Sequence, residues 1–324
     1  MASPGLSEIV TSTLENRSKD ISDAFTNNTA LMFRLNDKGN KKLLSGGRTI
    51  VREIAYAENG TFGFYSGYDT LNVSPSDVFT AAEYNWKQAA VAVSWSGLEQ
   101  LQNSGPEQVF DLIEERITNA ESTMVNNLSD GLYSDGTGFS GKQVGGLQLL
   151  VSDAGTGTVG GINAGTWDFW QNYVYSFAAQ SGAPTPGPTT IQRAMNTTWL
   201  STKRNRDQVD LIVADNIFYS YYWESLQAQQ RFMDAKMASA GFDNLKFKNA
   251  DVVADGGLDG DAPASRMYFL NTKYLRLEVH KQRDMVPLGP GERSSVNQDA
   301  TVKLLGWAGN MTTSNRRLQG VIRP

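Results

Sequence analysis

The longest regular hydrophobic pattern in the chain lies between Ser104 and Tyr133. Its apolar positions recur every three or four residues, as they do on one face of a helix: Val109, Phe110, Ile113, Ile117, Ala120, Met124, Leu128 and Leu132. Ser104 and Glu107 have the spacing of a capping box, and Pro106 suits a first turn. The pattern predicts a helix over 106–133, about 42 Å long at about 1.5 Å per residue. One face should pack on a sheet, either as a structural spine or on the surface of an ordinary enzyme.

A second pattern, the alternation of apolar and polar residues, predicts a long β-hairpin over residues 48–96. Its first arm is 48–57, and its return arm runs through 82–97. Alternating apolar residues of the return arm share one face: Val91, Val93 and Trp95. We expect Tyr84 and Trp86 to pack at the base of the hairpin, which we call its foot.

The segment between the two arms, residues 59–77, is rich in Gly, Ser, Asp and aromatic residues. Four of its side chains are predicted to be exposed: Phe62, Phe64, Tyr65 and Tyr68. An extended arm with such side chains favours aggregation unless a partner covers it. The segment therefore indicates an assembly protein, with a lid over an active site as the alternative.

The first 45 residues predict a helix that needs a partner surface. Residues 6–26 are amphipathic but carry too little apolar surface to fold alone, so the segment should dock on something. A basic cluster follows: Lys38, Lys41, Lys42 and Arg48. A solvated loop and a contact with an anionic polymer are both consistent with this cluster.

The middle of the chain predicts a strand, a glycine-rich loop and a linker. Residues 147–151 (LQLLV) are strand-like, and 181–188 (SGAPTPGP) have the composition of a linker. The loop contains a GxGxxG pattern at Gly155, Gly157 and Gly160. A dinucleotide site needs these glycines to begin a helix, and the residues after Gly160 break any helix. We interpret the pattern as a chance match in a turn-rich loop.

Beyond the linker, helical and strand patterns alternate, which predicts an α/β or α+β module. The predicted helices are 190–204 and 216–232, and the predicted strands are 209–215, 251–255, 267–271 and 275–279. The acidic run 255–261 has the wrong order for a calcium loop and is interpreted as a solvated turn. The last segment, 297–323, predicts two strands broken at Gly306 and Gly309, returning to the first domain.

Composition excludes several classes of function. The 324 residues include 29 basic and 34 acidic ones, a net charge of −5 that is not typical of a protein built to grip nucleic acid. There is no cysteine and a single histidine, His280, so thiolate chemistry and multi-histidine metal sites are excluded. The N-terminus lacks the pattern of a signal peptide, and no apolar run has the length of a membrane span.

The recognised catalytic motifs are missing from the sequence: GxSxG, the Walker loop, HExxH and paired cysteines. Glu114, Glu115 and Asp299 are carboxylates without a recognisable catalytic partner. We therefore expect no catalytic residue, no cofactor and no metal, and not an enzyme.

In its order of segments the chain resembles the major capsid proteins of tailed bacteriophages, which have the Hong Kong 97-type fold. The resemblance covers nearly the whole chain and rests on a set of segments: GGRTIVREI, YSGYDTL, YNWKQAAVAVSWSGLE, the helix 106–133 with its DGTG turn, GGIN with Trp167 and Trp170, DLIVAD, MYFLNTKYLRL and WAGNMTTSNRRLQGVI. No single motif is specific, and their order and spacing carry the resemblance.

The resemblance implies an α+β subunit with five parts. These are an N-terminal arm (1–45), an extended hairpin called the E-loop (46–96), a P-domain with a spine helix at 106–133 (97–184), an α/β A-domain (185–290) and closing strands of the P-domain (291–324). Copies would form hexamers and pentamers of an icosahedral shell around packaged double-stranded DNA, in a virion assembled in the host cytoplasm. The E-loop would lie across a neighbouring subunit, and shells would mature by expansion of a procapsid.

The resemblance also implies partners. The short arm before the hairpin leaves no room for a built-in scaffolding segment, so we expect a separate scaffolding protein, together with a portal and in some cases a decoration protein. Covalent cross-links, which some relatives form through a lysine, are not expected here, although Lys87 is available on the return arm. No membrane is implied.

For assembly, Arg316 and Arg317 are expected to pair with acidic groups of a neighbouring P-domain, with ordinary intramolecular packing or surface charge as the alternative. On that expectation, replacing both with alanine would leave the monomer folded and impair shells. Two other functions stay open: an encapsulin-like nanocompartment shell with the same fold, and an α/β enzyme that uses the hairpin as a lid.

Overall fold

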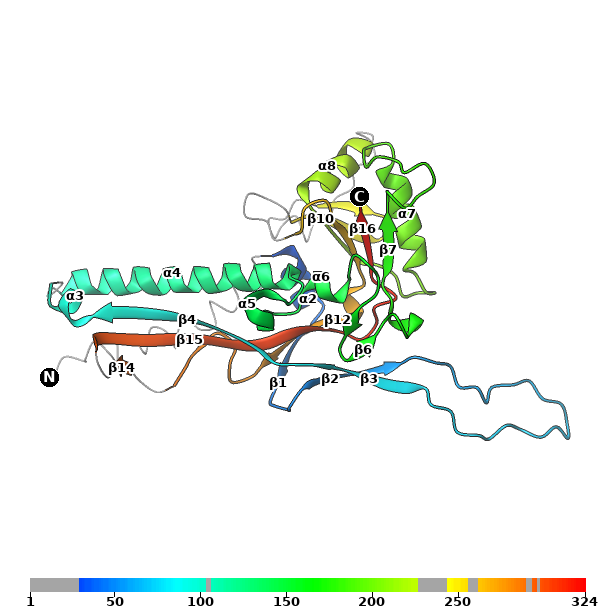
Figure 1. The fold of residues 1–324 in the computed structure, drawn as a ribbon, viewed down its shortest axis with the longest axis horizontal. Helices are drawn as coiled ribbons and strands as arrows, with labels where there is room; N and C mark the ends of the chain where they lie inside the picture. The colour runs from blue at the N-terminus through cyan, green and yellow to red at the C-terminus, as the bar shows by residue number, and fades with distance from the viewer. Residues whose placement is uncertain (1–28, 103–105, 227–243, 256–261, 290–292, 296–297) are drawn as a thin grey trace.

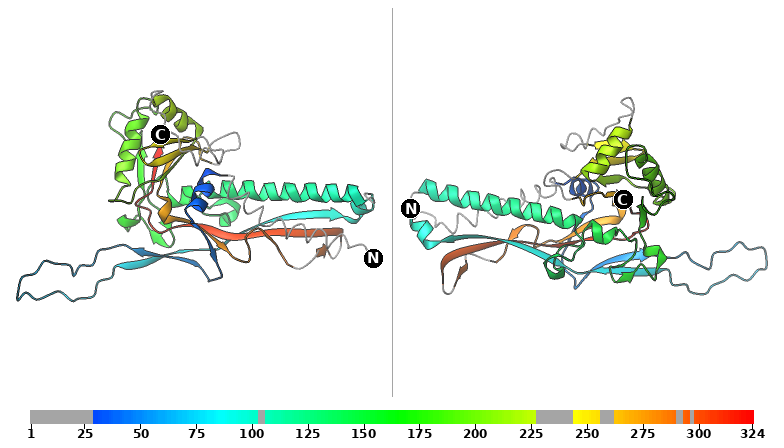
Figure 2. Two further views of the ribbon diagram at one scale, coloured as in Figure 1. Left: turned by 180° about the vertical axis from the view of Figure 1, so that it is seen from behind. Right: turned by 45° about the horizontal axis from the view of Figure 1, so that its top comes forward.

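The computed structural model describes residues 29–102, 106–226, 244–255, 262–289, 293–295 and 298–324. The molecule is elongated (Figure 1): helix α4 and strands β4 and β15 run side by side in one direction, and the hairpin of β2 and β3 extends in the other. A compact α/β body stands between them and carries the C-terminus. Figure 2 shows the same arrangement from two further sides. The fold is a mixed α+β one, as the sequence predicts.

The first sheet is built around one long strand, β15 (Gln298–Thr313). On one side β15 pairs antiparallel with β12 (Leu275–His280), which in turn pairs parallel with β1 (Lys41–Leu44). The other partners of β15 are β4, β13 and β14, all antiparallel, at Lys87–Ser96, Val286–Pro287 and Arg293–Ser295 respectively. Ten consecutive residues of β4 pair with β15, so this ladder forms the backbone of the elongated half of the molecule.

The second sheet is the centre of the α/β body. Its strand order is β7-β16-β11-β8-β10-β9. The strands are β7 (Tyr173–Ser176), β8 (Leu211–Ala214), β9 (Asn244–Phe247), β10 (Ala250–Ala254), β11 (Met267–Leu270) and β16 (Gly320–Arg323). Helices α7 (Ile191–Ser201) and α8 (Asn216–Ser225) pack their buried apolar residues with those of this sheet. The predicted alternation of helix and strand after the linker is confirmed.

The shorter elements connect these units. They are α2 (Ala30–Asp37), α3 (Gly97–Gln102), the helical turn α5 (Gly138–Gly141), α6 (Leu147–Leu150), the small hairpin of β5 (Thr158–Val159) and β6 (Ile162–Asn163), and the 3-10 turns η1 (Asp168–Trp170) and η3 (Thr272–Tyr274). The GxGxxG pattern falls in the loop and small hairpin of β5 and β6, and no helix begins at its glycines. Its interpretation as a chance match is consistent with this geometry.

Helix α4 spans Pro106–Tyr133, the bounds that the sequence predicts. Its buried residues continue the predicted apolar stripe: Ile117, Ala120, Met124, Val125, Leu128, Leu132 and Tyr133. At the far end, Ile117 and Ala120 pack with Val93 and Trp95 of β4, which share a face as predicted. The helix therefore lies on the β4–β15 ladder along one face. Ser104, the predicted cap, lies outside the described residues.

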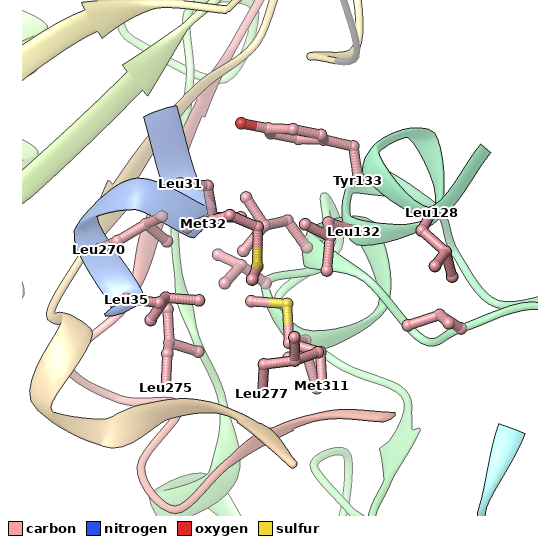
Figure 3. Packing of buried hydrophobic residues seen from close by; sticks show 14 of the residues in the cluster. Leu31, Met32, Leu35, Leu128, Leu132, Tyr133, Leu270, Leu275, Leu277 and Met311 are labelled. Carbon is pink, nitrogen blue, oxygen red and sulfur yellow. The ribbon is translucent and has the colours of Figure 1, made fainter. Parts of the chain in front are cut away.

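The main core joins the two sheets where α4 ends (Figure 3). Helix α2 is capped by Thr29, whose hydroxyl accepts a hydrogen bond from the Met32 amide at 3.3 Å, and the helix inserts four apolar residues there, Ala30 among them. The cluster drawn in Figure 3 combines residues from α2, α4, β11, β12 and β15: Leu31, Met32, Leu35, Leu128, Leu132, Tyr133, Leu270, Leu275, Leu277 and Met311. This shared core holds the elongated half, the body and the foot of the hairpin as one unit.

The predicted hairpin is correct for its inner part and wrong for the end of its return arm. Strands β2 (Ile50–Ala55) and β3 (Phe79–Tyr84) pair antiparallel, from Ile50 with Tyr84 to Ala55 with Phe79. After Trp86 the chain leaves β2, and β4 pairs with β15 instead. The reason is burial: in this position β4 places Val93 and Trp95 against α4, which a free hairpin could not do.

The predicted domain boundaries need correction as well. β7 precedes the predicted linker at 181–188 and yet belongs to the second sheet. β16 also joins the second sheet, whereas β12 lies in the first. Residues 147–151 contain the helical turn α6, with Leu147 and Leu150 buried three positions apart. Short apolar runs do not distinguish strand from helix, and pairing between distant strands leaves no local pattern.

The predicted break at Gly306 and Gly309 is absent, because β15 passes through both without interruption. These glycines are needed for close contacts. A Cβ atom at Gly306 would lie 2.4 Å from the side chain of Leu288. A Cβ atom at Gly309 would lie 2.6 Å from the Glu278 carbonyl oxygen and 2.7 Å from the Trp307 ring.

We predict that Gly309→Ala destabilises the subunit by about 1–3 kcal/mol, because neighbouring backbone and a buried ring would have to move. Gly187→Ala is the matched control, since its Cβ would meet nothing within 4 Å. That change should be neutral or slightly stabilising. Urea unfolding of both variants measures the difference, and equal midpoints would contradict the prediction.

Candidate assembly surfaces

The four aromatic side chains at the hairpin tip are exposed, as the sequence predicts. Their exposed fractions are 79% for Phe62, 97% for Phe64, 67% for Tyr65 and 107% for Tyr68. Phe62 and Phe64 contact each other edge to face, with ring centroids 5.4 Å apart. The tip stands clear of the described body (Figure 2). Such a surface is costly to leave in water, and it is typical of a site that a partner covers.

The tip also has a charge of one sign. Residues 57–78 contain three acidic side chains, Glu58, Asp69 and Asp77, and no Lys or Arg. Local hydrogen bonds shape the turn: the Ser66 amide donates to the Asp69 carboxylate at 2.8 Å, and the Thr61 amide donates to the Asn59 side chain at 3.0 Å. The tip therefore has an acidic and aromatic surface, and local hydrogen bonds hold the conformation of its turn.

Tyr84 and Trp86 lie at the foot of the hairpin, where the sequence places them. The Tyr84 hydroxyl donates to the Thr313 carbonyl oxygen at 2.9 Å, and burial raises the pKa of this phenol. The Trp86 indole N–H donates to the Gly47 carbonyl oxygen at 2.9 Å, and its ring lies edge-on to His280 at 5.6 Å. His280 is half-buried on β12, as expected for the single histidine. Their contact with a neighbouring subunit remains a prediction.

Sequence reasoning missed a buried ion pair beside these residues. The Arg52 guanidinium, on the buried face of β2, donates to the Glu278 carboxylate of β12 at 3.2 Å and to the Ser314 hydroxyl at 3.2 Å. Burial raises the pKa of Glu278, and the charges of Arg52 and Arg276 oppose the rise. Burial likewise lowers the pKa of Arg52. The signal in the sequence was an arginine between Ile50 and Ile54 in an alternating strand.

The expectation for Arg316 is wrong, because its side chain is fully buried in its own subunit. Its guanidinium donates to the Leu150 carbonyl oxygen at 2.8 Å, the Asn172 side-chain oxygen at 2.9 Å and the Ser152 hydroxyl at 3.3 Å. Burial lowers the pKa of Arg316 to about 10, so it stays protonated at neutral pH. It ties the turn after β15 to α6 and β7 and cannot reach a neighbour. Arg317, the next residue, is exposed and keeps its predicted role as a possible contact.

Two cavities flank an aromatic cluster at the foot of the hairpin. Tyr56 stacks on Phe169 with centroids 5.3 Å apart, and Trp167 lies 6.0 Å from Phe169. One cavity, of about 660 Å³, lies between β3 and the β5–β6 hairpin. The other, of about 470 Å³, has Arg204 and Arg317 in its wall. Both hollows are lined in part by residues of this aromatic cluster.

A third hollow, of about 530 Å³, lies between α4 and β4. Its wall includes an ion pair in which Arg116 of α4 donates to Glu99 of α3 at 2.7 Å. Arg116 also donates to the Ser94 carbonyl oxygen at 2.7 Å. These contacts join α3, α4 and β4 at the far end of the elongated half.

This ion pair predicts a pH dependence of stability. The hydrogen bond from Arg116 lowers the pKa of Glu99 to about 2, from an ordinary value of 4.5. A lowered carboxylate pKa stabilises the folded state above about pH 4.5, and the contribution disappears as the pH falls toward about 2. Glu99→Gln should therefore be less stable than wild type at neutral pH and equal to it near pH 2.

Urea midpoints measured from about pH 7 to about pH 2 test this expectation. The exposed residue Glu224 on α8 provides the matched control, Glu224→Gln. A gap between wild type and Glu99→Gln that stays constant with pH would contradict the assignment.

The structure also shows where several other residues singled out from the sequence lie. Of the basic cluster, Lys41 pairs with Asp284 at 2.9 Å, and Lys38, Lys42 and Arg48 are exposed. The Lys87 ammonium donates to the Gly141 carbonyl oxygen. The predicted helix 6–26 and most of the acidic run 255–261 lie outside the described residues.

Two further features concern metal ions and membranes, within the residues that the structure describes. No three His, Asp or Glu side chains among them are grouped so that they could hold a metal ion. None of their helices has the length and hydropathy to cross a membrane.

Comparison with solved structures finds the same architecture in phage shells. The capsid asymmetric unit of cyanophage A-1(L) superimposes with a TM-score of 0.60 over 87% of this chain and 89% of that one, at 18% identity. The capsid of Myoviridae phage XM1 gives a TM-score of 0.55 over 89% and 91%, at 13% identity. The chain has the Hong Kong 97-like capsid fold. At these identities the likeness establishes the fold alone.

The capsid fold is also found outside phage shells. The encapsulin of the holo-SrpI complex from Synechococcus elongatus PCC 7942 matches with a TM-score of 0.50 over 90% of this chain and 86% of that one, at 8% identity. In sequence, no protein-family model matches the chain, and no curated protein is similar to it.

Proposed function

We propose that this chain is the major capsid protein of a tailed phage, a structural subunit that assembles into hexamers and pentamers of an icosahedral shell around packaged double-stranded DNA. The observation that carries the proposal is the agreement in fold with two phage capsid subunits over nearly nine-tenths of both chains. An agreement of that extent reaches beyond the α/β body into the elongated half, because the body alone is a much smaller share of the chain.

Within this proposal each part of the subunit has a role. The hairpin of β2 and β3 is the E-loop, α4 is the spine helix, the first sheet belongs to the P-domain and the second sheet to the A-domain. The E-loop extends beyond its own subunit, so its exposed aromatic tip is covered by a neighbour. Repetition of moderate contacts of this kind gives a stable closed shell.

The proposal includes partners and a location. The subunit is part of the virion, and its shell is assembled in the host cytoplasm with a separate scaffolding protein and a portal. A decoration protein could bind the outside, and contact with DNA would be non-specific. The net charge of −5 favours loose contact with the packaged DNA over tight binding.

A second candidate is the shell of an encapsulin-like nanocompartment, because an encapsulin has the same fold. A hairpin that acts as an enzyme lid is less well supported. The hairpin points away from the second sheet and does not fold back over it (Figure 2).

The test is to purify the protein, with and without the scaffolding protein expressed from neighbouring genes, and to examine it by light scattering and negative-stain microscopy. Closed shells, rings or tubes of capsid size support a self-assembling coat. Particles that contain nuclease-protected DNA favour the phage capsid, and particles filled with one enzyme favour the nanocompartment. A monomer that persists under both conditions contradicts both shell functions.

A further inference from the structure

The foot of the hairpin is held from several directions at once. On the side of the first sheet, the Arg52 guanidinium reaches across to Glu278 and Ser314, both at 3.2 Å. Both charged side chains of this pair are almost fully buried, with exposed fractions of 8% and 5%. A buried ion pair holds its two side chains in a defined direction, and loss of either partner leaves the charge of the other buried without that partner. This contact therefore resists rotation of β2 against β12.

A second contact acts on the outer edge of β3. The Glu83 amide donates to the Gly160 carbonyl oxygen of the β5–β6 turn at 2.9 Å. The turn approaches so closely that a Cβ atom at Gly160 would lie 2.7 Å from the Cβ atom of Ala82. Gly160 has a φ of +58°, a conformation that glycine adopts without strain. The turn thus acts as a stop against which β3 rests.

A third contact lies where the paired strands end. The Tyr56 amide donates to the Val78 carbonyl oxygen at 3.0 Å, just beyond the last pair of the ladder. The Tyr56 ring stacks on Phe169 of the η1 turn with an interplanar angle of 28°. Outward of Tyr56, the two arms run clear of the described body (Figure 2).

The geometry of the arm explains why these contacts matter. About eleven residues on each side beyond Tyr56 extend roughly 36 Å at about 3.3 Å per residue. A rotation of about 10° at the foot would move the tip by about 6 Å on an arm of that length. A free joint at the foot would therefore spread the tip over a large volume, and ordering it on assembly would cost binding free energy.

We propose that Arg52 with Glu278, the Gly160 turn and the Tyr56–Phe169 stack form a clamp that fixes the angle of the hairpin in the unassembled subunit. The clamp presents the aromatic tip to the next copy in a preset position. These are positioning residues, since they act on the partner surface through the direction of the arm. The role of the fixed angle in assembly rests on the proposed function. The fixed angle itself follows from the contacts within one subunit and is independent of that function.

The experiment uses the natural absence of cysteine. Thr70→Cys at the tip and Ser201→Cys at the end of α7, both exposed, accept a donor and an acceptor dye. Single-molecule energy transfer on the unassembled subunit fraction then reports the spread of distances between tip and body. A control pair, Asn126→Cys on α4 with Ser201→Cys, reports the distance between α4 and the body and does not involve the hairpin.

We expect one narrow tip-to-body distribution in the otherwise unchanged chain. Glu278→Gln and Gly160→Ala should each widen it about twofold, because one contact of the clamp is weakened or pushed away. The control pair should stay unchanged in both. Asp153→Asn, which breaks the Arg266–Asp153 pair away from the hairpin, is the matched control and should not widen the distribution.

A broad distribution in the unchanged chain, or narrow ones in both clamp variants, overturns the proposal. If Glu278→Gln prevents folding, Gly160→Ala still tests the proposal, because the Gly160→Ala variant keeps the ion pair between Arg52 and Glu278. The measurement is made on single subunits, so a chain that forms no shells can still have a clamped hairpin. Failure of the proposed function and failure of the clamp are thereby distinguished.

Discussion

Replacing Phe62, Phe64, Tyr65 and Tyr68 together with serine is expected to prevent shell formation and to leave the subunit as stable as wild type. All four side chains are at least two-thirds exposed, so the fold gains little from them. Substitutions at such positions change the free energy of unfolding by less than about 0.5 kcal/mol.

The effect on assembly should be large, because the proposed function places the same side chains in an interface with a neighbouring subunit, where they become buried. Burying one large aromatic side chain contributes about 1.5–3 kcal/mol, so four of them contribute about 6 kcal/mol or more per subunit. Every 1.4 kcal/mol, roughly, changes an association constant tenfold. We therefore expect the assembled fraction to fall by at least about tenfold under conditions that give shells from wild type.

Sedimentation of the assembled fraction, with thermal unfolding of the subunit, measures both effects. Tyr65→Phe with Tyr68→Phe is the matched control, since it keeps both rings and should keep the shells. Normal shells from the serine variant would remove the tip from the assembly interface.

Arg316→Ala is expected to destabilise the subunit itself by about 3 kcal/mol or more. The change leaves the buried carbonyl oxygen of Leu150 without the Arg316 donor, removes one of the donors to the Asn172 side-chain oxygen, and opens a cavity where the guanidinium lay. Any loss of shells from this variant would follow from loss of the fold.

The adjacent residue is the control: Arg317→Ala should alter the free energy of unfolding by less than about 0.5 kcal/mol, because that side chain is exposed. Denaturant unfolding of the two single variants separates the roles. Equal stabilities would mean that the buried hydrogen bonds of Arg316 contribute nothing.

These two arginines illustrate where sequence reasoning reached its limit. Adjacent residues in a loop carry no signal that tells a buried side chain from an exposed one, and the acceptors of Arg316 lie more than a hundred positions away along the chain. Long periodic segments were easier: α4 keeps its predicted bounds, because its apolar stripe and its proline are local features.

The sequence predicts where individual strands lie and does not predict which strands pair with each other. β4 was assigned to the hairpin, because its alternation fits either partner equally well. The buried position of Arg52 could not be predicted for a related reason. Its ion-pair partner, Glu278, lies on a strand far along the chain, and the sequence does not show that the two strands meet. The pattern of residues predicts an α/β or α+β module after the linker, and the family resemblance implies the α+β capsid fold, whereas the contacts of the foot needed the three-dimensional arrangement.

The central position of β15 has a consequence for how the protein is made. Trp95 of β4 pairs with Thr301, a residue synthesised roughly 200 positions later. At about 5–20 residues per second, the ribosome leaves β4 and one face of α4 without their sheet for about 10–40 s. The second sheet waits about 7–30 s at the same rate, because β16 lies between β7 and β11 and is synthesised roughly 147 positions after β7. The nascent chain must therefore be protected from aggregation until its last strands emerge, so chaperone supply in the cell that makes the protein should limit the yield of folded chains.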